Sequence, residues 1–459
     1  MQVALAAMAG AWLVFEWVRV LVREQVEGDF LNHWEFGRRF AAGLPLYKDG
    51  LDVVYLPLWA MGHALLAFMP PRTAAFVVFP VAPMALMLIL VLLARLSAGA
   101  LPLLRGGGFW ATALALALTS PFVSRDLPLC GQNLALVALT WSGLYLWLRR
   151  RELPGAVLLG LAIALKCTPL IFVGYLLLKR QWRMAALTLG FVALFTVAPA
   201  LRMGWSGPSG FATSVRQWAG FVRQAATQPD PSRGALAYDA PGKPGQVVYD
   251  ESLMNLSLKP ALARYLMHLP AGHLGRPDSR WYFDFLDLSP RTAGLAVKIV
   301  TALLLLGAAW LFRTPIARHS DPALLWELAA VSILMLLISP ITWKQHCVAL
   351  LPPAYLIGRT LLHKKGTSLI SPPPAPIQKT TSIFLGLDAA LLAAYILLAI
   401  LLQRGVIGRS ATDLMDSYHL RTAALLLLLV LTLRGWRGRL FRVNADPISE
   451  AARSPAPTP

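Results

Sequence analysis

Ten side chains that could take part in chemistry lie in short polar segments between long apolar stretches of this sequence. They supply a carboxylate, cations, imidazoles, amides and an indole, and they are Asp29, His33, Arg125, Gln132, Asn133, Lys166, Asn255, Trp343, Lys344 and His346. A carboxylate can take a proton from a hydroxyl group, and cations can stabilise the charge that develops on a leaving group. Together these groups suit a ligand with a phosphate head group, polar hydroxyls and a lipid tail.

The stretches between these residues are long and apolar enough to cross a membrane. Of the 459 residues, 57% are hydrophobic and 14% are charged, and the mean hydropathy is +0.58. Soluble domains carry about 25% charged residues. Several apolar runs reach the roughly 17–25 residues that a membrane-spanning helix needs, among them 72–94, 184–203, 291–312 and 380–402. The composition therefore predicts an all-α polytopic membrane protein.

The net charge of +19 is concentrated in short loops between the apolar runs. The basic clusters lie at 149–152, 179–183, 312–319, 363–365 and 434–442. Clusters of this kind mark the cytoplasmic side of a membrane protein. Membrane orientation therefore explains the charge better than binding to a nucleic acid does, and we predict no nucleic-acid partner.

With the basic loops inside, the chain crosses the membrane about twelve times and has both termini in the cytoplasm. Residues 1–435 form the transmembrane domain, with a first outer loop at 24–52 and a long outer loop at 204–290. We also predict a Pro-rich cytoplasmic linker at 364–379 and a disordered cytoplasmic tail at 443–459. The predicted crossings and hairpin arms are 1–22, 72–94, 109–123, 132–148, 153–165, 168–178, 184–203, 291–312, 322–338, 346–362, 380–402 and 420–433. This path places the ten polar residues at the outer ends of the helices.

The sequence contains no pattern typical of a disulfide framework or a metal site. Its three cysteines, Cys130, Cys167 and Cys347, are odd in number and form no C-x-x-C pair, which argues against both a disulfide framework and a zinc ribbon. Asp49 and Asp52 are separated by two residues, so they form no D-x-D pair. We therefore expect neither a metal ion nor another cofactor.

Six short motifs follow one another in an order that resembles the bacterial glycosyltransferase family 87. They span roughly residues 25–360 and read "GDF…GLPLY", "YLPL", "GQN", "GLAIALKCTPLIFVGYLLLKRQWR", "NLSL" and "SPITWKQH". Members of this family have the glycosyltransferase C-type fold. They resemble polyprenyl-phosphate-mannose-dependent mannosyltransferases, and some are arabinofuranosyltransferases. The resemblance implies an enzyme of the bacterial inner membrane whose extracytoplasmic loops form the active site.

The resemblance also implies roles for the polar residues. Asp29, in the first outer loop, would be the catalytic base of an inverting transfer. Lys166, Arg125, Lys344 and His346 would stabilise the phosphate of the donor, and the other residues would bind substrate. The expected partners are a polyprenyl-phosphate sugar, a glycolipid or glycan acceptor, and the lipid bilayer.

Several of these residues also have an ordinary structural explanation. Glu35 is an alternative base, Asn133 could cap a helix, and the Lys166 side chain could reach to the membrane surface. Other local explanations are an ion pair between Arg125 and Asp126 and interfacial packing of Tyr47 and Tyr55. At the level of the whole chain, the alternatives are a transporter or flippase of a lipid-linked saccharide and a non-catalytic scaffold. A transporter would need ionisable groups in the membrane centre. The ionisable groups of this chain lie mostly at the outer ends of the predicted helices, and Asp388 is an exception.

Overall fold

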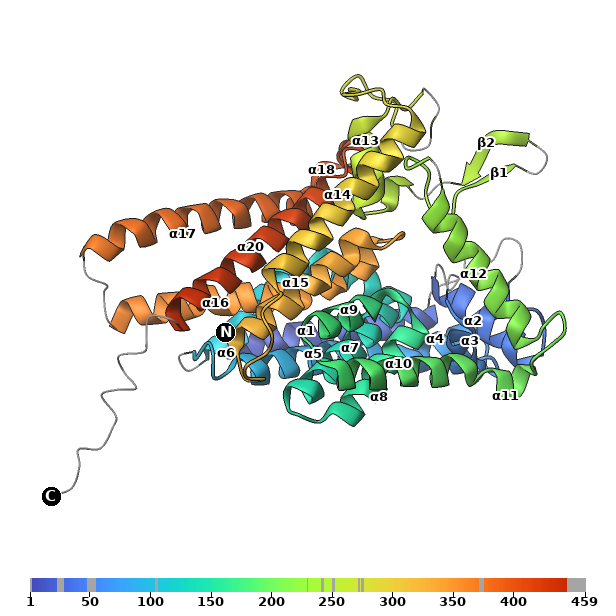
Figure 1. Ribbon diagram of the computed structural model, residues 1–459, viewed down its shortest axis with the longest axis horizontal. Helices are drawn as coiled ribbons and strands as arrows, with labels where there is room; N and C mark the ends of the chain where they lie inside the picture. The colour runs from blue at the N-terminus through green and yellow to red at the C-terminus, as the bar shows by residue number, and fades with distance from the viewer. Residues whose placement is uncertain are drawn as a thin grey trace.

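The computed structural model describes residues 2–22, 29–47, 55–103, 106–228, 230–240, 243–249, 252–270, 273, 276–370 and 375–443. Helices make up nearly all the regular structure of these residues (Figure 1). The exception is a hairpin in which β1 (Tyr238–Ala240) pairs antiparallel with β2 (Lys243–Tyr249). The all-α prediction therefore holds for the apolar part of the chain and misses this small hairpin.

The helices follow the predicted apolar segments closely. Two predicted segments coincide with whole helices, α7 (Gln132–Leu148) and α15 (Pro322–Ile338). Others differ from the prediction by some residues at their ends or consist of two consecutive helical pieces. These are α1 (Gln2–Val22), α4 (Pro71–Val78) with α5 (Val81–Ser97), α6 (Gly107–Asp126) with η1 (Leu127–Leu129), α10 (Trp182–Val197) with α11 (Ala200–Met203), α14 (Pro290–Leu311), η4 (Lys344–Leu350) with α16 (Leu351–Ile370), α17 (Ala375–Ile396) with η5 (Leu397–Leu401), and α20 (Leu420–Val443).

The centre of the molecule is α15. Apart from Glu327 and Ser332, this helix is apolar on all sides, and it is buried along nearly its whole length, as expected for a helix surrounded by others. It packs against α20 on one side and contacts α16 and η4 on another. The same buried cluster extends through α5, α6 and α7. This core fixes the ends of the helices from which the polar loops emerge.

The predicted short hairpin after α7 is present. It consists of α8 (Glu152–Leu165), η2 (Thr168–Leu170) and α9 (Ile171–Leu178), and Lys166 lies at its tip. Helix α8 lies against α7 with almost no space between the backbones, because a Cβ atom on Gly143 would approach the Gly155 carbonyl oxygen to 2.8 Å. Two glycines thus allow the close contact that holds the tip of the hairpin in place.

Fewer helices than predicted are long and apolar enough to cross a membrane. Within the described ranges four qualify, and a fifth does if the pair 409–417 and 420–437, bent by 62°, counts as one span. The four are 71–97, 107–129, 182–203 and 290–311. Several other predicted crossings are shorter apolar helices, including 152–165, 168–178, 322–338 and 386–401. The number of twelve is therefore not confirmed, while a multi-pass membrane protein is.

The predicted outer loops contain ordered elements. Within 24–52 the structure describes α2 (Asp29–Ala41), and within 204–290 it describes α12 (Phe211–Thr227), the β-hairpin, η3 (Ser252–Met254) and α13 (Leu258–Leu266). Figure 1 shows α12, the hairpin and α13 at one end of the helical bundle. The predicted linker 364–379 is helical on both sides of 371–374, which lie outside the described residues, as does nearly all of the predicted tail.

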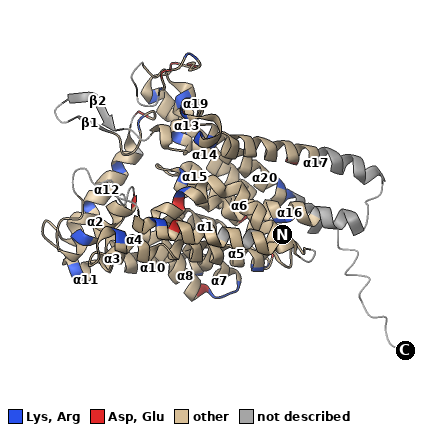
Figure 2. Cartoon of the chain, turned by 180° about the vertical axis from the view of Figure 1, so that it is seen from behind, with Lys and Arg blue, Asp and Glu red and all other residues tan. Residues whose placement is uncertain are grey.

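Charged side chains are sparse along the helices. Most of the ribbon in Figure 2 is uncharged, and Lys and Arg gather near α13 and α19 (Arg409–Ser417). The long helices α14, α17 and α20 reach this same end of the molecule in Figure 1, beside α18 (Arg404–Ile407). Polar groups from distant parts of the sequence therefore meet where the helices end.

Candidate active site

Asp29 lies at the start of α2, facing a large cavity. Its Oδ2 atom accepts a hydrogen bond of 2.9 Å from Nε2 of Gln345, which is almost fully buried in η4. The position suits an acid, because a carboxylate in the first turn of a helix is stabilised by the helix dipole. The cavity has a volume of about 700 Å³, and Asp29, Arg125, Trp343 and Lys344 line it. One carboxylate oxygen of Asp29 is thus held by the protein at the wall of a ligand-sized space.

Glu35, the alternative base, is engaged elsewhere. Its two carboxylate oxygens accept hydrogen bonds from the Arg38 guanidinium at 2.6 and 2.7 Å, and Arg39 lies 3.9 Å away. Glu35 is not among the residues that line the cavity. The geometry therefore favours Asp29 over Glu35 as a proton acceptor for a ligand in the cavity.

Lys166 is the centre of a polar network that joins four segments of the chain. Its Nζ lies 3.2 Å from Asn133 Oδ1, 3.0 Å from His346 Nε2 and 3.4 Å from the Tyr55 hydroxyl. Burial lowers the pKa of Lys166 to about 8, and the negative charges of Asp29 and Asp126 oppose that shift. The charge of Asp29 thus acts on Lys166, although Lys166 lines a smaller pocket with Asn133 and His346 and not the cavity of Asp29.

A tight turn before α7 places Asn133 in this network. Cys130 and Gly131 both have positive φ angles, 64° and 59°, a conformation that is most easily adopted by glycine. The turn directs the side chain of Asp126 at the new helix, where it accepts hydrogen bonds from Asn133 Nδ2 at 2.8 Å and from the Leu134 backbone at 3.0 Å. Asp126 therefore caps α7, and Asn133 bridges this cap to Lys166.

Arg125 and Asp126 diverge although they are neighbours in the sequence. Asp126, the last residue of α6, is fully buried and binds the first turn of α7, whereas Arg125 is exposed and lines the cavity. No ion pair between them is present in the described structure. The local pairing considered from the sequence is thus replaced by two separate environments.

His33 belongs to a buried aromatic group. Trp59 Nε1 donates a 2.9 Å hydrogen bond to His33 Nδ1, and the Tyr55 ring packs edge-on at 4.8 Å. Burial, followed by the charges of His63 and Lys166, lowers the pKa of His33 well below its usual value. The neutral ring therefore carries its proton on Nε2, which finds no acceptor within the described part of the chain. The Nε2 atom is itself buried, and His33 does not line the cavity of Asp29, so contact of His33 with a ligand stays a prediction.

Two of the other predicted residues, Gln132 and Asn255, have partners within the protein. Gln132 Nε2 lies 3.3 Å from His63 Nε2. Asn255 is buried, and its amide binds the backbone of Pro340, Thr342 and Ser257, which ties the long loop to the segment before η4. A role of Asn255 in positioning this segment fits the contacts better than direct contact with a sugar, which stays a prediction.

The segment from Trp343 to His346 connects the cavity beside Asp29 with the polar network around Lys166. Trp343 and Lys344 line the large cavity, while His346 contacts Lys166 and stacks on Trp343 with ring centroids 5.9 Å apart. Lys344 Nζ lies 3.7 Å from Asp416 of α19. Three of the predicted residues in this segment are thus brought to the site as the sequence suggests.

The sequence of the middle of the chain decides its family. The model of glycosyltransferase family 87 matches residues 54–340, which is more than half of the chain. The chain belongs to this family. The resemblance seen in the short motifs is thereby confirmed, and the protein is a glycosyltransferase.

The family 87 chain has a characterised relative and two distant structural neighbours. It is 26% identical over 371 residues to the polyprenol-phosphate-mannose-dependent alpha-(1-2)-phosphatidylinositol mannoside mannosyltransferase of Mycolicibacterium smegmatis, a match that covers 74% of each chain. Crystal structures of ArnT from Cupriavidus metallidurans are 16% identical to it. The apo structure has a TM-score of 0.36 and covers 95% of this chain and 78% of ArnT, and the complex with undecaprenyl phosphate has a TM-score of 0.37 and covers 99% and 81%. Structural similarity this low does not contribute to the assignment of the chain to family 87.

Some residues at the site of this glycosyltransferase were missed in the sequence. Tyr55, expected to lie in the membrane interface, is buried and contacts Lys166, and Gln345 holds Asp29. The structure also adds three arginines near α19, namely Arg404, Arg409 and Arg421, to the cavity wall. The available signal was the polar stretch 403–419, which separates two apolar segments on the predicted outer side.

Proposed function

We propose that this family 87 enzyme transfers a sugar, with mannose as the first candidate, from a polyprenyl-phosphate donor to a glycolipid or glycan acceptor. We further propose a glycosyltransferase C-type fold and an active site on the extracytoplasmic face of the bacterial inner membrane. The observation that carries the proposal is the hydrogen-bonded carboxylate of Asp29 at the wall of a cavity whose lining also includes five cationic side chains. The name of the mycobacterial relative supports both the lipid-linked donor and mannose.

In the proposed step, Asp29 removes the proton from an acceptor hydroxyl as its oxygen attacks the anomeric carbon of the donor sugar. A new carbon–oxygen bond forms, and the bond between the anomeric carbon and the phosphate oxygen breaks. The bonding electrons leave with the phosphate, which departs as polyprenyl phosphate, and the configuration at the anomeric carbon is inverted. No general acid is required, because phosphate is a good leaving group.

The charge on the departing phosphate requires a cation near the anomeric carbon. Lys166 suits this role, because its ammonium group is held by Asn133, Tyr55 and His346 and the charge of Asp29 acts on it. His33 Nε2–H and the Trp343 ring are further candidates for contact with the sugar. We propose that the transfer needs no metal ion.

The test is transfer of label from polyprenyl-phosphate-[¹⁴C]mannose to membrane lipid extract by purified protein, with and without EDTA. We expect wild-type transfer to be unaffected by EDTA and to fall by about 10²–10⁴-fold in Asp29→Asn. The matched control is Glu35→Gln, which removes an acid from the same helix and should retain transfer. Loss of activity in Glu35→Gln with normal activity in Asp29→Asn would move the base to Glu35.

Two other outcomes would redirect the proposal. Transfer only from an arabinofuranosyl donor would change the sugar and keep the site. Movement of a lipid-linked saccharide across vesicles without bond formation would indicate a transporter. The structure gives the transporter little support, because Asp388 in α17 is paired with Arg434 of α20 at 2.6 Å.

A further inference from the structure

Four large apolar side chains are exposed on the short segment that precedes α14. Trp281, Phe283, Phe285 and Leu286 are 58%, 56%, 58% and 51% exposed, whereas Tyr282 is only 7% exposed. The segment is neither helical nor part of a sheet, and its side chains alternate between an inward and an outward side. The three outward rings and the leucine form one apolar surface, which we call the aromatic platform.

The backbone under the aromatic platform is bound to the rest of the protein. The Tyr418 hydroxyl accepts a hydrogen bond from the Phe283 N–H group at 2.8 Å and donates one to the Trp281 carbonyl at 2.7 Å. Arg264 Nη2 donates to the Phe283 carbonyl at 2.6 Å. The Arg264 guanidinium also packs against the Tyr282 and Tyr418 rings, 3.8 and 4.6 Å from their centroids, which is a cation–π contact. The platform is therefore a fixed surface, whose rings are kept outward by the inward contacts of the backbone.

The aromatic platform leads directly into a helix that can span the membrane. Helix α14 begins at Pro290, four positions after Leu286, and only 6% of its apolar window is buried in the protein. Exposed apolar residues continue along it, with Leu295, Ile299 and Leu303 60%, 50% and 63% exposed. Figure 1 shows α13, which packs against the first turns of α14, at this end of the helix. Four residues span at most about 14 Å, so the platform lies within reach of the interfacial layer that α14 enters.

The residue types of the aromatic platform suit a lipid interface better than a saccharide. Tryptophan, phenylalanine and leucine enter the boundary between head groups and acyl chains, and arginines beside them attract anionic head groups. Arg280 and Arg291 are exposed on either side of the platform, and the Arg280 guanidinium lies 5.0 Å from the Trp281 ring. A saccharide site would need polar groups among the rings to bind the hydroxyls. Asp284, the polar side chain between the rings, is instead bound to His268 at 2.9 Å.

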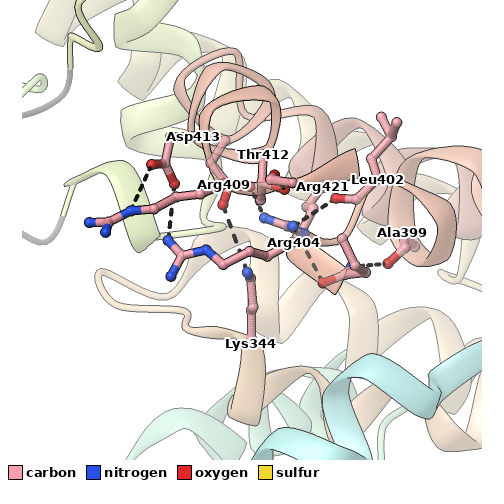
Figure 3. Close-up of polar contacts among 11 residues, drawn as sticks. Lys344, Ala399, Leu402, Arg404, Arg409, Thr412, Asp413 and Arg421 are labelled. Atoms are coloured by element: carbon pink, nitrogen blue, oxygen red, sulfur yellow. Dashed lines mark hydrogen bonds and ion pairs between the residues drawn. The ribbon is translucent and has the colours of Figure 1, made fainter. Parts of the chain in front are cut away.

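The aromatic platform is connected to the wall of the large cavity. Tyr418, whose hydroxyl holds the platform, is the residue that ends α19. Arg409, Thr412 and Asp413 of α19 line the cavity, and their polar contacts are shown in Figure 3. The Tyr265 hydroxyl of α13 donates a 2.7 Å hydrogen bond to the Tyr418 carbonyl. The platform, α13 and α19 thus form one connected unit at the cavity end of the molecule.

We propose that the aromatic platform inserts into the interfacial layer of the membrane leaflet on the cavity side, so that its partner is the lipid bilayer. The bilayer then fixes the depth of α13 and α19, and with them one wall of the cavity, relative to the lipid head groups. The contact does not depend on sugar transfer and therefore goes beyond the proposed function. It gives the segment before α14 a role as a membrane anchor of the cavity wall.

Quenching of a fluorescent label by lipid-attached and aqueous quenchers tests the contact. The purified full chain carries bimane on Phe283→Cys in a Cys167→Ala background, since Cys130 and Cys347 are buried, and is reconstituted in nanodiscs of phosphatidylcholine and phosphatidylglycerol. We expect 5-doxyl-phosphatidylcholine to lower the fluorescence at least about twofold and iodide to lower it by less than about 20%, because the label lies in the interfacial layer. The matched control is Gln217→Cys, at an exposed position on the polar face of α12, where iodide should be the stronger quencher.

Three results would overturn the inference. Strong quenching by iodide without quenching by the doxyl lipid would show that the aromatic platform faces water. Protection from iodide only after mannose oligosaccharides are added would assign the platform to a saccharide, and quenching by neither agent in nanodiscs that hold two copies would assign it to a second copy of the chain. Phe285→Cys, on the same surface, repeats the test if Phe283→Cys does not fold. Sugar transfer enters none of these measurements, so failure of the inference is distinguishable from failure of the proposed function.

Discussion

At the scale of single residues, the site depends on contacts that join distant parts of the chain. Gln345 and Asp29 are 316 positions apart, yet Gln345 is the residue that holds the proposed base. In the sequence, Gln345 stands between Lys344 and His346, which are both predicted site residues. Nothing in the sequence marks Gln345 itself as a functional residue. Its importance follows only from the direction in which η4 presents its buried face.

We expect Gln345→Leu to lower kcat by about tenfold to a hundredfold with little change in the KM for the donor. The variant keeps a similar volume but removes the donor to Asp29 Oδ2, so the carboxylate loses its fixed orientation, and small errors in position are costly in catalysis. Steady-state transfer assays measure both constants. Gln181→Leu, in the loop before α10, is the control for a glutamine lost elsewhere. An equal fall of activity in that control, or an unchanged kcat in Gln345→Leu, would count against the positioning role.

We expect the rate of sugar transfer to fall at alkaline pH, because Lys166 loses its proton there. Its pKa is lowered to about 8 by burial, so the ammonium loses its proton as the pH rises through about 8, and its contribution to phosphate binding is lost with it. Transfer at low donor concentration should therefore be maximal below this pH and decline above it. In Lys166→Arg the charge persists at high pH, so any remaining activity should lose the alkaline decline. A pH–rate profile of the two proteins tests this, and identical profiles would exclude Lys166 as the group that titrates.

At the scale of elements, the close contact between α7 and α8 sets the position of the Lys166 tip. The predicted boundaries of both helices were accurate to within one residue, because their apolar runs are long and end at clear turns. The contact itself depends on Gly143 facing Gly155. The sequence contains many glycines, and nothing local marks these two as a pair.

Gly143→Ala should destabilise the protein by about 1–3 kcal/mol, because the added Cβ atom would overlap the backbone of α8. Gly190→Ala is the matched control, since the space around Gly190 in α10 is open and no atom lies within 4 Å of an added Cβ. Thermal unfolding in detergent, followed by the fluorescence of a thiol-reactive dye, compares the two. Equal melting temperatures for both variants would show that α7 and α8 can separate without loss of stability.

At the scale of the whole molecule, a buried ion pair ties three helices together at the α9 end of the hairpin. Lys179 Nζ lies 2.7 Å from Glu327 Oε2, and the side chains are 2% and 5% exposed. Glu327 also accepts hydrogen bonds from the Tyr175 hydroxyl at 2.7 Å and from Trp436 Nε1 at 3.2 Å. Because these residues come from α9, α15 and α20, the pair joins the two halves of the chain around the core.

Removing one member of this pair should be more harmful than removing both. Glu327→Leu leaves the Lys179 ammonium buried without its partner, which costs about 3–5 kcal/mol, whereas Lys179→Leu/Glu327→Leu avoids the unpaired charge. We expect the double variant to unfold at a higher temperature than Glu327→Leu does. A double variant as unstable as the single one would mean that the hydrogen bonds of Tyr175 and Trp436, rather than the ion pair, hold the helices together.

The sequence by itself determined the helical class, the approximate boundaries of the long apolar helices and the family. These properties depend on local composition and on the order of short motifs, which can be read without knowing which segments touch. It also identified Asp29, Lys166, Trp343, Lys344 and His346, because polar residues are conspicuous in an apolar chain. The roles assigned to them stay predictions.

Only the tertiary structure decided which of these residues share one space. It paired Glu35 with Arg38, turned Asp126 inward to cap α7, and fixed Asn255 on the backbone. It also brought Arg404, Arg409 and Arg421, from α18 to α20 (Figure 3), to the cavity of Asp29. The physical reason is that burial and pairing depend on how the helices pack. Packing joins residues hundreds of positions apart, which no local pattern in the sequence records.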